Sequence, residues 1–176
     1  RIVADGCDVA EGGEGELWIS GEGIFSGYFG QKDATAAAFE GAWFRTGDLF
    51  RRDREGYYYM LGRIKDVIRR SGENISASEV ELAVGAVPGV LEAAALPVPD
   101  DLRGEEIKVY VVLAPGTSRE ALVPKAIVDH CRSRIAPFKL PRYIAYVAEI
   151  PKTHTGKIDK NALKKSAADL RLGSFD

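Results

Sequence analysis

The chain has 176 residues, which is enough for one compact domain or for one small domain with a piece of another. Hydrophobic residues make up 45% of it and charged residues 28%, the values of an ordinary globular protein, so a disordered chain is excluded. The net charge of −2 gives no basis for nucleic acid or an anionic membrane as a general partner, and no apolar run approaches the roughly 20 residues of a transmembrane segment.

The first part of the chain, residues 1–62, has the pattern of β structure. Polar and apolar residues alternate over 16–20 after a glycine-rich turn, which predicts a strand. A short helix is expected over 33–39, with Asp33 as its N-cap. Residues 49–61 predict a hairpin around a four-residue loop. Two or three strands with a short helix do not make a self-sufficient core, so we interpret this part as the end of a larger domain.

The second part, residues 67–176, predicts a complete small α+β unit with a mostly antiparallel sheet flanked by helices. After a turn at 71–74, helices are expected over about 76–87 and 119–135 and strands over 90–97, 107–113 and 143–147. Ser76 and Glu79 form the S-x-x-E pattern of a capping box. The run 109–113 is apolar at every position, which predicts a strand buried on both faces. Asp159 is expected to cap a last, lysine-bearing helix.

The two cysteines, Cys7 and Cys131, lie far apart and lack the spacing of a metal site. We expect both to be plain buried or semi-buried thiols in a reducing cytoplasm. The sequence begins with Arg1, without an initiator methionine or a signal peptide, which indicates a fragment or a processed product.

Three residues stand out as candidates for nucleotide chemistry. The carboxylate of Asp48 can accept two hydrogen bonds from vicinal hydroxyls, as on a ribose, although a turn or cap aspartate is the alternative. A hairpin loop centred near residues 54 and 55 would place position 48 opposite 61. Arg63 then lies within one or two residue pairs of Asp48, where it could reach the same sugar or simply form a surface salt bridge.

The third candidate is Lys157, in a loop rich in threonine and glycine just before the last helix. An ammonium on a flexible stem suits charge stabilisation in phosphoryl or nucleotidyl transfer. The alternative is a solvated lysine in a basic tail, since residues 152–165 contain five lysines against one aspartate. The Gly156-Lys157 pair is not a P-loop, because Ile158 follows it.

Four segments, in chain order, resemble motifs of the adenylate-forming ligase superfamily, which comprises acyl- and aryl-CoA synthetases, peptide-synthetase adenylation domains and beetle luciferases. They are Glu14-Gly15-Glu16-Leu17 with Gly27-Tyr28, the W-[FY]-x-T-G-D segment Trp43 to Asp48, Gly62 to Glu81, and the P-[KR]-[TN]-x-[TS]-G-K segment Pro151 to Lys157. Any one of them is weak evidence, but four at family-like spacing argue against chance.

The resemblance implies a structural role for each part of the chain. Residues 1–62 would be the C-terminal end of the large ATP- and acyl-binding domain. Residues 63–66 would be a hinge, centred on Lys65. Residues 67–176 would be the mobile C-terminal lid, which serves two half-reactions in turn by rotating.

The resemblance also implies a role for each candidate residue. Asp48 would bind the ribose of ATP, with Arg63 beside it. Lys157 would bridge the carboxylate substrate and the α-phosphate of ATP during adenylation, where its charge offsets the charge on phosphorus. Arg69 and Gly72 would face the thiol of CoA in the second step, and the glycine would let the pantetheine approach.

The implied reaction is that of an acyl-CoA synthetase, which converts a carboxylic acid and ATP to acyl-AMP and pyrophosphate and then forms the CoA thioester with release of AMP. Mg²⁺ would accompany ATP, with no protein ligand in this chain. Residues 69–76 and 138–144 look most like bacterial acyl-CoA ligases, including fatty-acid and crotonobetaine/carnitine-CoA-ligase-like enzymes. Lys65 argues against a peptide-synthetase domain, which usually has aspartate at this position. A ligase that loads a carrier protein, and a non-catalytic nucleotide-binding or in-trans partner module, are the alternatives.

The family's phosphate loop, adenine-side segment and acyl pocket are absent from this sequence, since they lie upstream in the family. We therefore expect the chain alone to be inactive and to need the missing N-terminal part of the same enzyme. Without those neighbours, Trp18, Ile24 and Phe25 are expected to lie exposed or in a partner's groove. A dimer through this region would then reflect the truncation.

Overall fold

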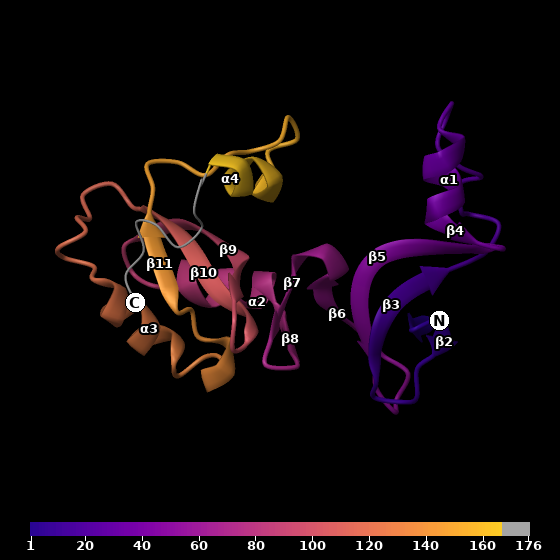
Figure 1. Cartoon of the computed structure of the whole chain (residues 1–176), viewed down its shortest axis with the longest axis horizontal. Coiled ribbons are helices and arrows are strands. Elements are labelled where there is room, and N and C mark those ends of the chain that lie inside the picture. The colour runs from indigo at the N-terminus through magenta and orange to yellow at the C-terminus, as the bar shows by residue number, and fades with distance from the viewer. Residues whose placement is uncertain (167–176) are drawn as a thin grey trace. The chain divides into compact units, whose positions relative to one another are not determined.

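The computed structural model describes residues 1–166, and the chain divides between Lys65 and Asp66 into two units (Figure 1). The boundary falls inside the segment 63–66 that the resemblance assigns to a hinge, but the action of Lys65 as a hinge stays a prediction. Residues 167–176, the end of the expected lid domain, lie outside the described residues.

The first unit is built on a single antiparallel sheet. Its elements are β1 (Ile2–Ala4), β2 (Cys7–Asp8), β3 (Glu14–Ile19), α1 (Lys32–Ala38), β4 (Phe39–Glu40), β5 (Trp43–Arg52) and β6 (Tyr58–Arg63). The strand order is β2-β1-β3-β5-β4, and β6 also pairs with β5. The strand expected over 16–20 is therefore confirmed, within a sheet of more strands than the sequence predicts.

This unit buries few large apolar side chains, and Trp18 is the largest of them. We expected Trp18 to be exposed, but only 6% of it is. The guanidinium groups of Arg1 and Arg45 lie 4.9 and 5.5 Å from its ring centroid, and its indole nitrogen donates a hydrogen bond to Glu16. Cation–π contacts of this kind cover an aromatic ring without an apolar neighbour. Phe25 is 41% exposed, as expected.

The helix α1 does not use the cap that the sequence suggests. Asp33 lies in its first turn, where a negative charge favours the helix dipole, and Gln31 occupies the N-cap position without a side-chain cap. The hydroxyl of Thr35 instead donates to the carbonyl of Gln31 at 2.8 Å and accepts from the amide of Tyr28 at 2.9 Å. Thr35, inside the helix, thus holds the preceding loop by hydrogen bonds. The prediction that Asp33 is the N-cap was wrong.

The β5–β6 hairpin is confirmed, but its register differs from the prediction by two residues. Asp48 pairs with Arg63 instead of with position 61. The loop spans residues 53–57, because the Asp53 carboxylate accepts hydrogen bonds from two amides within it. The ladder also shifts between Leu49 and Phe50, as at a β-bulge. The longer loop and the bulge each move the partner of Asp48 by one position.

The second unit is the α+β domain expected from the sequence. A 3₁₀ turn, η1 (Ile64–Asp66), leads into it. Its other elements are β7 (Val67–Arg70), β8 (Glu73–Ser76), α2 (Ala77–Gly85), β9 (Val90–Asp100), β10 (Gly104–Leu113), α3 (Pro124–Cys131), η2 (Pro137–Lys139), β11 (Tyr143–Tyr146) and α4 (Lys160–Ser166). The order is β11-β10-β7-β8 with β9 paired to β10, and among these strand pairs of residues 66–166 only β10–β11 is parallel.

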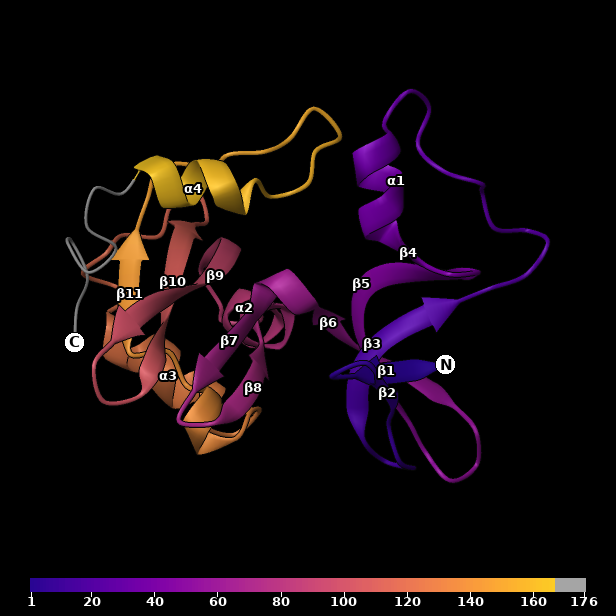
Figure 2. The same cartoon turned by 45° about the vertical axis from the view of Figure 1, so that its right-hand side comes forward.

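The central strand β10 is buried on both faces, which confirms the prediction for its apolar run. Successive side chains of a strand point to opposite faces of the sheet. Val109 and Val111 accordingly join the cluster that includes side chains of α2 and α3, whereas Tyr110 and Val112 join the cluster that includes Leu163 of α4. Helices therefore cover both faces of this sheet (Figure 2).

Two helix starts in this unit differ from the sequence prediction. Ser76 occupies the N-cap position of α2 without a side-chain cap, and Glu79 forms an ion pair with Lys139 at 2.7 Å, so the expected capping box is absent. The helix expected over 119–135 covers only Pro124–Cys131, because a proline at the first turn fixes the start of α3.

The last helix is capped as predicted. Asp159 Oδ1 accepts hydrogen bonds from the amides of Asn161 and Ala162 at 3.1 and 2.9 Å. Of the two cysteines, Cys131 is buried as expected, but Cys7 is exposed on the short strand β2.

Candidate functional site

Asp48 and Arg63 face each other across the β5–β6 ladder. Arg63 Nε lies 2.8 Å from Asp48 Oδ1, so the surface salt bridge considered for these residues is present. The Asp48 side chain is 21% exposed and that of Arg63 is 51% exposed. The pair places a carboxylate acceptor next to a guanidinium donor at the surface, a combination that can hold a hydroxylated, negatively charged ligand.

Neighbouring residues fix the backbone around Asp48. The Thr46 hydroxyl accepts from the amide of Asp48 at 3.1 Å and donates to the carbonyl of Leu17 at 2.7 Å. Glu16 Oε1 accepts from the amide of Gly47 at 3.0 Å, and its other oxygen is 3.2 Å from Arg45 Nε. Gly47 has a φ of +70°, which suits glycine. Glu16 therefore holds the Thr-Gly-Asp segment in place, a role that the sequence did not suggest.

Arg69 and Gly72 lie on the tight β7–β8 hairpin. Ser71 and Gly72 connect the strands with φ values of +52° and +85°, the left-handed pair of a type I′ turn. A Cβ at Gly72 would meet no atom within 4 Å, so the tip of the hairpin is open. The backbone amide of Arg69 donates a hydrogen bond to Glu105 at 2.7 Å, and the Arg69 side chain is exposed.

A buried carboxylate lies beneath this hairpin. Glu106 of β10 has no exposed surface and makes a two-point contact with Arg70, with Nε–Oε2 and Nη2–Oε1 distances of 2.8 and 3.0 Å. Arg103 and Arg142 approach the same carboxylate at 3.2 and 3.7 Å. Arg70 also donates to the carbonyl of Phe138 at 2.6 Å. The arginine cluster thus fastens the end of β7 to the central strand.

Lys157 lies on a small hairpin between β11 and α4. Lys152 and Ile158 form an antiparallel bridge at its base, and the amide of Thr153 donates to the carbonyl of Lys157 at 2.7 Å. Gly156 makes the turn with a φ of +80°. The Lys157 side chain is exposed, and within residues 1–166 its ammonium has no hydrogen bond or ion pair. It is therefore held by its backbone and open to a ligand.

The candidate residues fall into separate groups. The structure brings Asp48 and Arg63 together in the first unit, and places Arg69 and Gly72 on one hairpin of the second. Lys65, at the boundary, is exposed.

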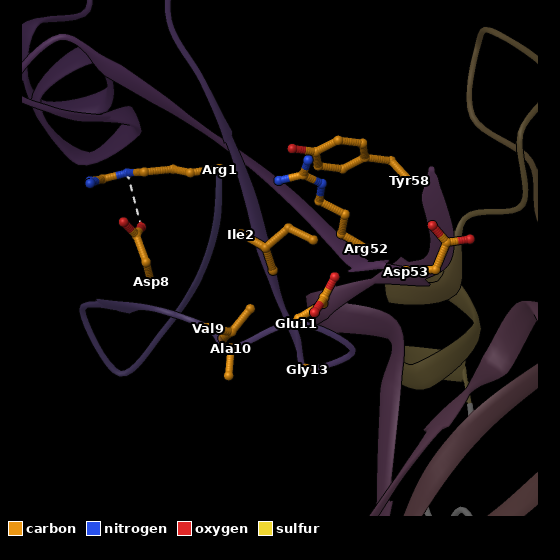
Figure 3. Close-up of a pocket in the computed structure, with 10 residues that line it drawn as sticks. All are labelled: Arg1, Ile2, Asp8, Val9, Ala10, Glu11, Gly13, Arg52, Asp53 and Tyr58. Atoms are coloured by element: carbon orange, nitrogen blue, oxygen red, sulfur yellow. Dashed lines mark ion pairs between the residues drawn. The ribbon is translucent and has the colours of Figure 1, made fainter. Parts of the chain in front are cut away.

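A surface pocket of about 330 Å³ in the first unit contains none of these residues (Figure 3). Its walls include Arg1, Asp8, Arg52, Asp53 and Tyr58. Arg1 Nε and Asp8 Oδ1 are 3.6 Å apart across one side of it. The pocket therefore adds nothing to the candidate site.

Known proteins are similar to this chain in both sequence and fold. Residues 79–157 match the family model of the AMP-binding enzyme C-terminal domain. The solved structure of o-succinylbenzoate CoA synthetase from Bacillus subtilis, in complex with the acyl-adenylate intermediate OSB-AMP, is similar with a TM-score of 0.82 and 32% sequence identity. That similarity covers 93% of this chain and 33% of the other. The chain belongs to the adenylate-forming enzyme superfamily.

Several curated relatives of this chain are CoA ligases. Sulfoacetate–CoA ligase of Cupriavidus necator is 38% identical over 164 residues, which cover 93% of this chain and 32% of the relative. Long-chain-fatty-acid–CoA ligase FadD13 of Mycobacterium tuberculosis has the same identity and the same coverage. The chain thus spans about a third of the length of the curated relatives it matches, and it corresponds to a C-terminal portion of an adenylate-forming enzyme.

The described residues lack the features of two other classes of site. No helix within residues 1–166 is long and apolar enough to cross a membrane. The same residues contain no group of three or more His, Cys, Asp or Glu side chains that could hold a metal ion.

The sequence reasoning missed two carboxylates that hold the backbone near the candidate residues, namely Glu16 and Glu106. Glu106 gave a usable signal, because it directly precedes the expected strand 107–113, which is buried on both faces, and a charge buried there must be paired. Glu16 lies in an ordinary amphipathic pattern, and only its partners in the structure reveal its role.

Proposed function

We propose that this chain is the C-terminal part of an ATP-dependent acyl-CoA synthetase. The observation that carries the proposal is the Lys157 hairpin, whose ammonium is exposed and has no partner within residues 1–166, in a chain with CoA ligases among its curated relatives. A lysine in a solvated tail would not need the β-bridge and the backbone hydrogen bond that hold this one. The division into two units at Lys65 further supports a lid that moves relative to the rest of the enzyme.

In the first half-reaction, an oxygen of the substrate carboxylate attacks the α-phosphorus of ATP, and pyrophosphate leaves. Asp48 accepts hydrogen bonds from the ribose hydroxyls, and Arg63 contacts the same nucleotide. To do so, Asp48 shares its carboxylate between the ligand and the guanidinium that it already faces. Lys157 bridges the attacking carboxylate and the α-phosphate, where its charge offsets the negative charge that develops in the transition state.

In the second half-reaction, the thiol of CoA attacks the acyl carbonyl, the thioester forms and AMP leaves. Rotation about Lys65 withdraws Lys157 and presents the hairpin of Arg69 and Gly72. The open tip at Gly72 leaves the backbone accessible to the pantetheine arm. Arg69, exposed on the same hairpin, is placed to attract the phosphates of CoA.

Mg²⁺ would neutralise the phosphates of ATP when the nucleotide binds. The described residues offer no cluster of metal ligands, so the ion would be held by the phosphates and by groups outside this chain. CoA is favoured over a carrier-protein thiol as the acceptor, because sulfoacetate–CoA ligase and FadD13, which resemble this chain, are CoA ligases. We also propose that the isolated chain is inactive, since it spans only about a third of those relatives.

The test is a Lys157→Ala variant of the complete enzyme that carries this chain, assayed for each half-reaction separately. Pyrophosphate release should fall by a factor of about 100 or more, since one electrostatic contact in the transition state is removed. Thioester formation from a supplied acyl-adenylate should stay close to that of the parent enzyme. Equal loss of both half-reactions would contradict the assigned roles. A product formed on a carrier protein but not on CoA would favour the alternative acceptor.

A further inference from the structure

Two ion pairs, one before the Lys157 loop in sequence and one after it, connect the hairpin to other elements of the second unit. Before the loop, Lys152 pairs with Glu92 of β9. After the loop, Lys160 Nζ lies 2.8 Å from Glu81 Oε1 of α2. The two pairs differ in burial, because the Lys152 and Glu92 side chains are 46% and 32% exposed whereas those of Lys160 and Glu81 are 17% and 19% exposed. The Glu81 pair is therefore the stronger anchor.

Glu81 is itself held from a second direction. Its Oε1 accepts a hydrogen bond of 2.9 Å from the amide of Ala95, on the edge of β9 that does not face β10. One carboxylate oxygen thus joins three elements, α2, β9 and α4. Ala95 is buried, and a buried backbone amide needs a hydrogen-bond acceptor, which Glu81 supplies. This hydrogen bond holds the Glu81 carboxylate independently of its ion pair with Lys160.

The ion pair with Glu81 acts close to Lys157 along the chain. Lys160 is the first residue of α4 and follows Lys157 by three positions. The amide of Asp159 donates to the carbonyl of Pro151 at 2.8 Å, which closes the base of the hairpin beside Lys160. Leu163, one turn later, is buried under the sheet. A displacement of the start of α4 would therefore be transmitted directly to the loop.

We propose that Glu81 is a positioning residue for Lys157, which fixes the start of α4 through Lys160 and so holds the ammonium of Lys157 where the α-phosphate will lie. This proposal rests on the proposed function of Lys157. Its physical basis is that catalysis by a charged group depends steeply on the placement of that group. Glu81 acts through Lys160 and touches no substrate.

The first test compares Glu81→Gln and Lys160→Met with the parent in the complete enzyme. Glutamine keeps an oxygen for the amide of Ala95 and removes only the charge, and Lys160→Met removes the same pair from the other side. Both variants should lower pyrophosphate release by about tenfold or more and leave thioester formation from acyl-adenylate within about twofold. The double variant should lose little more than either single one, since the two residues act as a pair.

Glu79→Gln is the matched control. Glu79 lies two positions earlier in α2 and also pairs with a lysine, Lys139 at 2.7 Å, whereas no hydrogen bond or ion pair joins it to residues 151–166. It should lower neither half-reaction by more than about twofold, although its effect on stability should resemble that of Glu81→Gln. If Glu81→Gln lowers both half-reactions equally, or neither, the positioning role is wrong.

A second test uses the chain of 176 residues and needs no activity. In Glu81→Gln, the amides of Thr153 and Asp159, which close the hairpin, should exchange with solvent at least about fivefold faster, whereas Glu79→Gln should leave them unchanged. Unchanged exchange in Glu81→Gln would refute the anchor whether or not Lys157 is catalytic. If exchange rises but Lys157→Ala leaves adenylation intact, it is the proposed function that fails.

Discussion

Replacing Glu106 with glutamine measures how strongly the buried arginine cluster stabilises the second unit. Glu106 has no exposed surface and the Arg70 side chain is 12% exposed, so the variant leaves a guanidinium without its counter-charge in a poorly hydrated site. Removing one partner of a buried pair costs about 3–5 kcal/mol. Glutamine keeps one oxygen for Arg70, and Arg103 and Arg142, at 44% and 39% exposed, can turn to water. We therefore expect a loss of about 3 kcal/mol, at the lower end of this range.

Urea unfolding of the whole chain can assign this loss to one unit. Both tryptophans, Trp18 and Trp43, lie in the first unit, so their fluorescence follows that unit alone. Far-ultraviolet circular dichroism is weighted to the second unit, which contains α2, α3 and α4. With a slope of about 1.5 kcal/mol per M, the dichroism midpoint should fall by about 2 M urea. The fluorescence midpoint should not move.

Two further variants make the experiment decisive. Glu149→Gln changes an exposed carboxylate of the same unit, and it should alter stability by no more than about 0.5 kcal/mol. The double variant Glu106→Gln with Arg70→Met should be less destabilised than the sum of the single changes, because it leaves no unpaired charge. A dichroism midpoint for Glu106→Gln equal to that of Glu149→Gln would refute the reasoning. An equal shift of the fluorescence midpoint would show that the two units do not unfold independently.

Two other predictions concern the ends of the second unit and the thiols. Asp159→Ala removes the acceptor for two amides of α4, so the dichroism transition should lose about 1 kcal/mol, and an unchanged transition would mean that the cap is replaced by water. A thiol reagent should modify Cys7 in the native chain and Cys131 only after unfolding, because Cys131 is buried and burial raises the pKa of its thiol, which lowers the thiolate fraction. Mass spectrometry of the labelled peptides decides between the two sites, and rapid native labelling of Cys131 would contradict its burial.

Features that depend on neighbouring residues could be read from the sequence. The cap at Asp159 follows from a carboxylate two and three positions before free amides, and the burial of β10 follows from its unbroken apolar run. The proximity of Asp48 and Arg63 could also be predicted, because a hairpin brings its two strands together. The register of the hairpin could not be predicted. One additional residue in the loop and one in a bulge change the residue that pairs with Asp48 without altering the hydrophobic pattern.

Features that depend on distant partners could not be read in this way. Glu79 has the spacing of a capping box, but Lys139, 60 positions away in sequence, offers it an ion pair instead. Glu106 meets Arg70, which comes 36 positions earlier. For the candidate site the difference is similar: the residues that bear the chemistry carry local motifs, whereas Glu81, which supports one of them, is recognised only from three elements that meet in space.

The free edge of β9 has a consequence for association between copies of the chain. Within residues 1–166, β9 pairs with β10 and with no second strand, and a long apolar strand paired on one side is a template for intermolecular strand addition and aggregation. On this edge the amide of Ala95 is taken by Glu81, and the backbone nitrogens of Pro97 and Pro99, which point the same way by the two-residue period of a strand, carry no hydrogen. From residue 95 to residue 99 the edge therefore offers no amide to an incoming strand, and the prolines and Glu81 together protect the β9–β10 pair against strand addition by another copy of the chain.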